Sequence, residues 1–215
     1  MKRPAAILFS LCVAAPVGAH PHIFIDTGLK LTFDADGVLK TVETTWVYDP
    51  LYSLLVTEDM QLDPDFDGVL TPDEVARLTG FDMQWVEGFN GDLVVLQDDR
   101  HLNLSGPVSY AASFADGRIT TTHVRNVMDA QAGVPFHLKP YDPTYYTAYD
   151  VTLPVTVTGP ESCRSRIEMP DLSSGLGAVR LQLMALDPEV DPADVGFEDI
   201  GAEFATTVIA TCAPS

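Results

Sequence analysis

Basic residues are scarce in this sequence, which has 12 Lys and Arg against 31 Asp and Glu over 215 residues. The formal net charge of -19 disfavours nucleic acid and anionic membrane surfaces as partners, because both are polyanions. Metal ions and other cations are the partners that such a surface attracts. An acidic surface that only keeps the protein in solution is an equally good explanation of this charge.

Long apolar runs are also missing, because no run reaches the ~20 residues that a membrane-spanning helix needs. The apolar run from residue 5 to about residue 15 follows two basic residues and precedes the small residues 17–19. This order predicts a signal peptide over residues 1–19, cut after Ala19. We therefore expect a periplasmic mature chain that begins at His20 and has no membrane span.

Cysteine is rare, and only Cys163 and Cys212 follow the predicted cleavage site. In an oxidising compartment an isolated pair is most simply a disulfide. Two thiolate ligands of a metal are the alternative, but metal-binding cysteines usually have a closer spacing. The sequence predicts a Cys163–Cys212 disulfide.

Motifs of hydrolytic enzymes are absent as well. The sequence has neither a nucleophile elbow nor the helix motif of zinc proteases. We therefore predict no enzymatic activity, with copper redox chemistry left open.

Short β-rich segments dominate what the sequence does contain. Residues 23–48 alternate apolar and polar side chains and predict a hairpin with its turn at Asp36-Gly37. Further β-rich runs between residues 92 and 157 are separated by Gly, Pro and Asp. A helix is expected over residues 172–186 and a closing strand over residues 204–210. These patterns predict an antiparallel sheet or sandwich.

A helical segment interrupts this β-rich pattern at about residues 49–90. Apolar residues up to Leu62 suit an entering helix, and apolar residues from Val75 to Phe89 recur at roughly helical spacing, with Gly80 as a point of interruption. The predicted fold class is α+β. It consists of one mainly antiparallel β domain over residues 20–215, with an inserted helix-loop-helix (EF-hand) and one short C-terminal helix.

Residues 63–74, with the sequence DPDFDGVLTPDE, match the calcium loop of an EF-hand. Calcium takes six to eight oxygen ligands, and such a loop supplies them from positions 1, 3, 5, 7, 9 and 12, with Gly at position 6. The residues at the ligand positions are Asp63, Asp65, Asp67, Val69 through its carbonyl, Thr71 and Glu74. A solvated Asp-rich turn is the alternative.

Extracellular calcium loops bind at ~10⁻⁴ to 10⁻³ M. We therefore expect a calcium ion that is steadily bound and stabilises the fold, since a sensor more often has a paired loop. A weaker match over residues 32–43 has Thr32 at position 1. Strand-like alternation on both sides of this second match predicts a hairpin turn instead.

The predicted cleavage after Ala19 exposes two histidines at the new N-terminus. In an extended segment His20, His22 and Asp26 point to one face. The α-amino group and the two imidazole rings are nitrogen donors that suit Cu, Ni or Zn. The interpretation is a candidate transition-metal site, with histidines that are merely exposed as the alternative.

Three internal histidines, at positions 101, 123 and 137, are further candidate donors to this site. Of these, His123 stands with His20, His22 and Asp26 as a candidate ligand. Each internal histidine is individually better explained as a surface or hydrogen-bonded residue.

Four segments carry a resemblance that covers most of the predicted mature chain. They are HPHIFID from His20, WVYDPLYS from Trp46, the acidic loop before its exiting helix, and YDPTYY from Tyr141. Together they resemble a family of periplasmic proteins of unknown function, described as the periplasmic component of an uncharacterised transport system. The gene context of that family is similar to that of nickel and cobalt permeases. The resemblance implies handling of a divalent metal such as Zn, Ni, Co or Cu, and it implies no catalytic residues.

The leading hypothesis is a periplasmic metal-binding accessory protein. It captures or delivers a divalent transition metal for a membrane transporter, while calcium keeps the insertion in shape. The first alternative is a calcium-stabilised structural or interaction module without a transition metal. The second is a copper redox protein with a histidine brace at His20.

Overall fold

The computed structural model describes residues 21–185 and 199–213, so the predicted signal peptide and His20 lie outside the described residues. Six strands form the first sheet: β1 (Ile23–Phe33), β2 (Leu39–Tyr48), β5 (Ser109–Ala115), β6 (Arg118–Asn126), β8 (Thr147–Asp150) and β9 (Val155–Thr158). Their order is β5-β6-β2-β1-β8, and β9 also pairs with β1. The pairings of β1 with β8 and β9 are parallel, and the others in this sheet are antiparallel.

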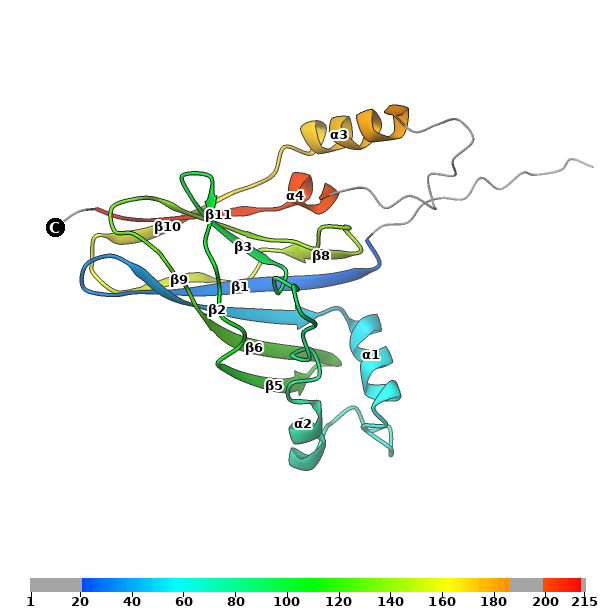
Figure 1. Ribbon diagram of the computed structural model, residues 1–215. Helices are drawn as coiled ribbons and strands as arrows, with labels where there is room; N and C mark the ends of the chain where they lie inside the picture. Colours follow the sequence, from blue (N-terminus) through cyan, green and yellow to red (C-terminus); the bar gives the residue numbers. More distant parts are fainter. Residues whose placement is uncertain (1–20, 186–198, 214–215) are drawn as a thin grey trace, which may run out of the picture.

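Five strands form the second sheet: β3 (Leu93–Gln97), β4 (Arg100–His101), β7 (Phe136–Pro140), β10 (Cys163–Glu168) and β11 (Thr207–Cys212). Their order is β10-β11-β7-β3-β4, and all pairings are antiparallel. Figure 1 shows this sheet lying over part of the first one. The arrangement confirms the predicted α+β class with a mainly antiparallel β domain.

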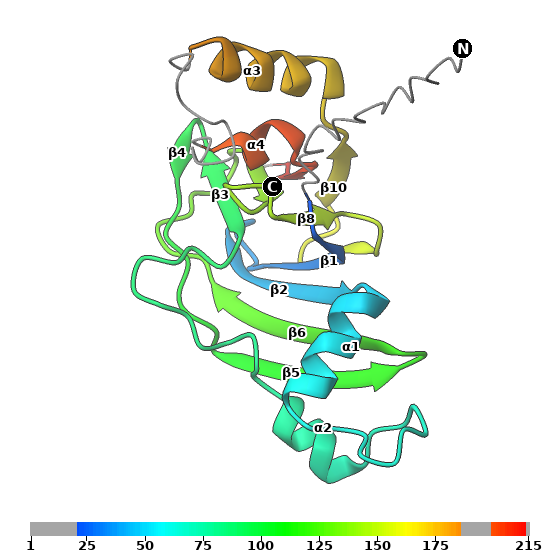
Figure 2. The same ribbon diagram turned by 90° about the vertical axis from the view of Figure 1, so that its right-hand side faces the viewer.

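Four helices complete the described part of the chain: α1 (Pro50–Asp59), α2 (Pro72–Leu78), α3 (Leu172–Ala185) and α4 (Ile200–Phe204). Figure 2 shows α1 across β6 and α2 beside β5, while α3 and α4 lie together at the far end of the molecule. The C-terminal region therefore has two helices where the sequence predicted one. The closing strand begins at Thr207, since residues 200–204 are helical.

The turn between β1 and β2 explains why the second calcium-like match is a hairpin. The carboxylate of Asp34 accepts hydrogen bonds from the N–H groups of Asp36 and Val38, at 3.0 and 2.9 Å. Gly37 has a φ of 78°, which glycine adopts without a steric penalty. The flanking residues pair across the two strands, so this segment is the predicted hairpin turn.

One face of the central strands β1, β2 and β6 is buried, and two different layers cover it. Between the two sheets lies the main core, which includes Leu29, Leu31, Phe33, Val42, Leu93, Phe136, Leu138 and Val208. Trp46 and Tyr48 project from the same face of β2 as Val42, because alternate strand residues share a face. They pack with Leu62 and Leu78 of the helical insertion. The insertion therefore continues the layer that the second sheet begins.

The predicted disulfide is present between Cys163 of β10 and Cys212 of β11. The two cysteines are direct partners in the antiparallel ladder. A structural disulfide of this kind fits a secreted or periplasmic protein. Within the described ranges no helix combines the length and apolar character needed to cross a bilayer.

Replacing both cysteines by alanine is expected to lower the free energy of unfolding. The bond joins residues that are 49 positions apart in the sequence. Without it the unfolded chain has more conformational entropy, which lowers the free energy of the unfolded state by on the order of 4 kcal/mol. Urea denaturation of the oxidised protein and of the double variant measures this difference. The reduced parent protein should match the variant, and an unchanged midpoint in both would contradict the expectation.

Candidate functional site

The loop between α1 and α2 brings three carboxylates together. One oxygen each from Asp63, Asp65 and Asp67 can be chosen so that all three lie within 4.8 Å of one another. The loop backbone is turned around Asp63, whose carboxylate accepts hydrogen bonds from the N–H groups of Asp67 and Gly68, both at 3.0 Å. Gly68 has a φ of 77°, which produces the sharp bend expected at position 6. Such converging oxygens suit a hard divalent cation.

Repulsion within the acidic cluster is visible at Asp65. The neighbouring negative charge of Asp67 is the main reason that the pKa of Asp65 is raised above its ordinary value. A bound cation would relieve this repulsion.

Glu74 closes the loop without joining the acidic cluster. Its carboxylate accepts hydrogen bonds from the N–H of Asp63 at 3.0 Å and from the N–H of Thr71 at 2.8 Å. The Thr71 side chain completes a capping box at the start of α2. The bonds to Thr71 are the main reason that the pKa of Glu74 is lowered. In the described residues the converging group contains only the three aspartates, so the ligand roles of Val69, Thr71 and Glu74 remain predictions.

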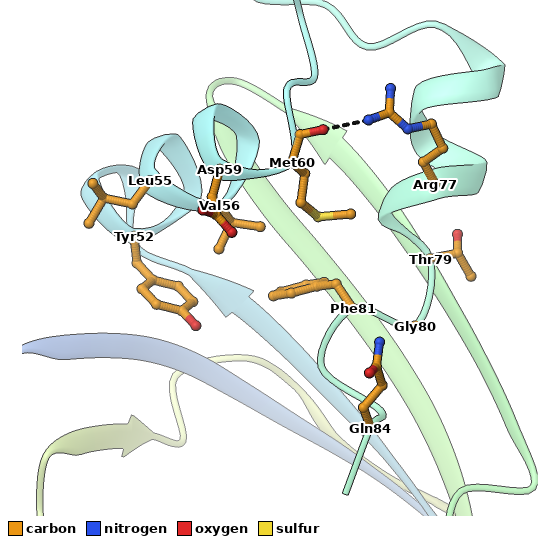
Figure 3. A pocket seen from close by; sticks show the side chains of 10 residues that line it. All are labelled: Tyr52, Leu55, Val56, Asp59, Met60, Arg77, Thr79, Gly80, Phe81 and Gln84. Atoms are coloured by element: carbon orange, nitrogen blue, oxygen red, sulfur yellow. Dashed lines mark hydrogen bonds between the residues drawn. The ribbon is translucent and has the colours of Figure 1, made fainter.

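A second connection joins the two helices next to this loop. The guanidinium of Arg77, in the last turn of α2, donates a hydrogen bond to the carbonyl of Met60 at the end of α1 (Figure 3). Between α1 and residues 77–84 lies a hollow of about 520 Å³, which Tyr52, Met60 and Phe81 line. The loop and Arg77 thus hold α1 and α2 as one unit.

The chain after α2 corrects the prediction of a longer exiting helix. α2 ends at Leu78, and the stretch that follows has no regular structure before β3. Gly80 adopts a φ of 85°, which interrupts the helix. Asp82 then turns inward, and its Oδ2 accepts hydrogen bonds from the Tyr48 hydroxyl at 2.8 Å and the Thr121 hydroxyl at 2.7 Å. These two bonds attach the insertion to β2 and β6.

His123 lies deep in the structure between two tryptophan rings. Its ring centroid is 4.7 Å from that of Trp46 and 5.6 Å from that of Trp85, and the residue is 1% exposed. Burial, and then the nearby charge of Arg125, lower the pKa of His123 to about 4. Neither ring nitrogen has a hydrogen-bond partner in the described part of the chain. His123 is therefore a neutral, buried imidazole.

The other candidate ligands near the N-terminus have separate surroundings. His22 is exposed, and its backbone N–H donates a hydrogen bond to the carbonyl of Tyr146 at 2.8 Å. The centroid of its ring lies 4.9 Å from that of the Tyr146 ring. Asp26 accepts a hydrogen bond from Thr152 at 2.6 Å and pairs with Arg118 at 2.7 Å. The bond from Thr152 is the largest cause of its lowered pKa.

The strand register separates His123 from His22. His123 pairs with Thr44, which pairs with Leu29 of β1. Leu29 lies ~20 Å along the strand from His22, at about 3.3 Å per residue. The structure therefore does not bring His123 to His22. His20 lies outside the described residues, so the pairing of His20 with His22 stays a prediction.

The sequence interpretation missed Asp82, Trp46 and Trp85 as interior site residues. The sequence does contain one signal for a polar interior site. The inward positions of β6 carry Thr121, His123 and Arg125, whereas a buried face is usually apolar. Asp82 gave no comparable signal. Its role depends on how an irregular segment folds back onto the sheet.

A family model described as a protein of unknown function (DUF1007) matches residues 5–212, which is nearly the whole chain. No curated protein matches the chain. The match agrees with the expected resemblance to a family of unknown function. Its description does not mention transport, calcium or a cofactor.

Buried His123 should make the protein less stable as the pH falls from 6.5 towards 4. In this range the unfolded chain takes up a proton at the histidine, whereas the folded state with its pKa of about 4 does not. The expected loss of unfolding free energy is about 3 kcal/mol by pH 4. Chemical denaturation at several pH values measures it.

His123→Leu should remove this part of the pH dependence, since leucine does not titrate. His101→Leu is the matched control at an exposed histidine and should keep the parent slope. An identical pH slope in the parent and in His123→Leu would show that the buried imidazole does not act in this way.

Proposed function

We propose a function for this chain from its own residues, because it belongs to the DUF1007 family of proteins of unknown function. The geometry best supports an exported protein that binds a divalent cation in the loop over residues 63–74. One observation carries this proposal, namely the convergence of the Asp63, Asp65 and Asp67 oxygens within 4.8 Å. These residues occupy positions 1, 3 and 5 of a twelve-residue calcium loop.

Calcium is the cation that the donor set fits best. All candidate ligands are oxygens, which calcium and magnesium prefer over softer transition metals. Magnesium needs a near-octahedral cage and keeps several waters, whereas a twelve-residue loop supplies the larger and more flexible calcium shell. Val69 through its carbonyl, Thr71 and Glu74 would complete that shell.

The proposed role of calcium is to stabilise the insertion. Leu62 immediately precedes the loop and Leu70 lies within it. Both are buried together with Leu78 of α2 against the first sheet. Neutralising the three aspartates would favour the loop conformation that places these leucines. Calcium would therefore strengthen the cover over this half of the sheet.

We also propose that the exported chain handles a divalent transition metal for a membrane transporter. The resemblance to a family whose gene context is similar to that of nickel and cobalt permeases, the acidic net charge and the exposed position of His22 support this proposal. A calcium-stabilised module without a transition metal is the main alternative, followed by a copper redox protein.

Calcium should raise the midpoint of thermal unfolding, and chelation with EGTA should lower it. Calcium at about ten times its dissociation constant contributes roughly 1.4 kcal/mol, which corresponds to a shift of about 3 to 6 °C for a chain of this size. Differential scanning calorimetry measures the difference. Asp65→Ala should remove most of the calcium effect, because alanine offers no ligand oxygen, whereas asparagine would keep one.

Asp73→Ala is the matched control for this experiment. Asp73 is exposed and lies in the same loop, but at a position that is not a ligand in calcium loops. This variant should respond to calcium as the parent does. An equal response of Asp65→Ala and the parent would contradict the proposed site.

The transition-metal proposal is tested by titrating the chain that begins at His20, with calcium already saturating. We expect saturable binding of at least one of Zn, Ni, Co and Cu, weakened at least about tenfold in His22→Ala because an imidazole ligand is lost. Isothermal titration calorimetry measures the affinity. His123→Leu should bind as the parent does, because His123 lies far from His22.

Absence of saturable binding in the parent would favour the calcium-stabilised module. Binding that His22→Ala leaves unchanged would move the site away from the N-terminus. Oxygen- or peroxide-dependent turnover with copper would instead favour the redox alternative.

A further inference from the structure

A second cavity, of about 160 Å³, lies where the insertion meets the first sheet. Aromatic rings form much of its wall. They come from both layers: Trp46 and Tyr48 from β2, Tyr149 from β8, Tyr52 from α1, and Trp85 and Phe89 from the segment after α2. Aromatic side chains can present the negative faces of their rings to a cation in such a cavity.

Two carboxylates, Asp82 and Asp92, also line this cavity. The Oδ1 of Asp82 is buried and has no hydrogen-bond partner in the described part of the chain. Asp92 accepts a hydrogen bond from the Tyr149 hydroxyl at 2.7 Å, and burial raises the pKa of Asp92 to about 6. Neither carboxylate takes part in an ion pair formed within the described ranges. In the described part of the chain, neither carboxylate is therefore neutralised by direct contact with a cationic side chain, and the Arg125 guanidinium contacts the Trp85 ring instead.

The indole of Trp46 adds an unused donor. Trp46 is 3% exposed, and its Nε1–H has no hydrogen-bond partner among the residues that the structure describes. A buried donor without a partner has lost its hydrogen bond to water without replacement, which costs free energy. A ligand oxygen that accepts from this group would recover that cost.

We propose that this cavity binds a small organic cation of roughly seven non-hydrogen atoms, with a quaternary or protonated amine and an oxygen acceptor. The aromatic faces and the carboxylates of Asp82 and Asp92 hold the positive charge. The indole N–H of Trp46 binds the oxygen. The size follows from the volume, since a cavity of about 150 Å³ accommodates benzene.

A metal ion fits this cavity less well than an organic cation. A metal needs several ligating atoms that converge on one point. In the described residues, three metal-ligating side chains converge at the loop cluster of Asp63, Asp65 and Asp67, and not at this cavity. The wall of this cavity is instead mainly aromatic, which suits the larger and softer surface of an alkylammonium ion.

The backbone at Gly91 packs tightly against the Trp85 side chain of the cavity wall. A Cβ atom at this position would lie 2.5 Å from the Trp85 ring and 2.7 Å from the Arg125 guanidinium. The guanidinium also stacks on the Trp85 ring, 4.9 Å from its centroid, and donates to the carbonyl of Asn90 at 2.6 Å. These contacts fix Trp85 and the adjacent Asp92 in the cavity wall.

Much of the wall belongs to the insertion, so the cavity depends on how the insertion is held. Tyr52 precedes the acidic loop, and Asp82, Trp85 and Asp92 follow it. Calcium in that loop is therefore expected to tighten cation binding. This coupling rests on the proposed calcium site, whereas the cavity itself does not.

Fluorescence titration tests the proposal, because both tryptophans of the chain line the cavity. The probes are choline and its uncharged isostere 3,3-dimethyl-1-butanol, added to the full mature chain with saturating calcium. We expect a saturable change with choline and at least tenfold weaker binding of the isostere. The positive charge is the difference between the two probes.

Two variants remove the groups that hold the charge. Asp92→Asn keeps an acceptor for Tyr149 and a side chain that tolerates the positive φ of 48° at this position. It should weaken choline binding at least tenfold. Trp85→Leu should do the same, with calorimetry as the readout because this variant lacks one tryptophan. Asp98→Asn, at an exposed position just after β3, is the matched control and should bind choline as the parent does.

Equal affinity for choline and the isostere would overturn the proposal, since the cavity would then be merely apolar. The absence of any saturable signal with choline, trimethylammonium or guanidinium would overturn it as well. Asp65→Ala, which is expected to lose most of its calcium affinity, distinguishes the two proposals. If Asp65→Ala binds choline as tightly as the parent, the cavity stands and its coupling to calcium is refuted.

Discussion

The second sheet covers only part of the inner face of the first sheet. The rest of the structure depends on what covers the remaining part of that face. Val42 packs between the sheets, while Trp46 and Tyr48 on the same face of β2 pack under the helical insertion. Uncovered, these aromatic residues would expose a large apolar surface to water. The insertion is therefore part of the core and more than a decoration of the surface.

In our account, the packing of the helical insertion on the first sheet depends on cations, because the insertion contains carboxylates without cationic partners in the described residues. The acidic loop collects Asp63, Asp65 and Asp67 within a few ångströms, and the interior beneath it holds Asp82 and Asp92 without ion-pair partners in the described residues. Like charges and buried charges both cost free energy until a cation compensates them. In our account calcium compensates the loop and an organic cation compensates the interior.

Much of this structure could be predicted from the sequence because it depends on local signals. The β1–β2 hairpin, the Cys163–Cys212 bond and the acidic loop each follow from turn chemistry, compartment or ligand spacing. Long-range geometry was not readable. Helical spacing favoured a helix reaching Phe89, but Gly80 and the inward hydrogen bonds of Asp82 end the regular structure much earlier.

The position of His123 shows the same limit, since only strand register determines which residues it approaches. The strands β7 and β10 were not singled out individually, because each is short and contains charged residues. Parallel pairing of β8 and β9 with β1 has no signature in a single sequence. Composition and spacing thus predicted the loop, but not the interior that the loop helps to cover.

The central claim is that calcium in loop 63–74 holds the insertion against the first sheet. Amide hydrogen exchange of the mature chain, with calcium and after chelation, tests it most directly. We predict that chelation speeds exchange in α1, α2 and residues 79–92, while the strands between the two sheets stay protected. Unchanged exchange throughout residues 50–92, in a protein shown to bind calcium, would contradict the claim.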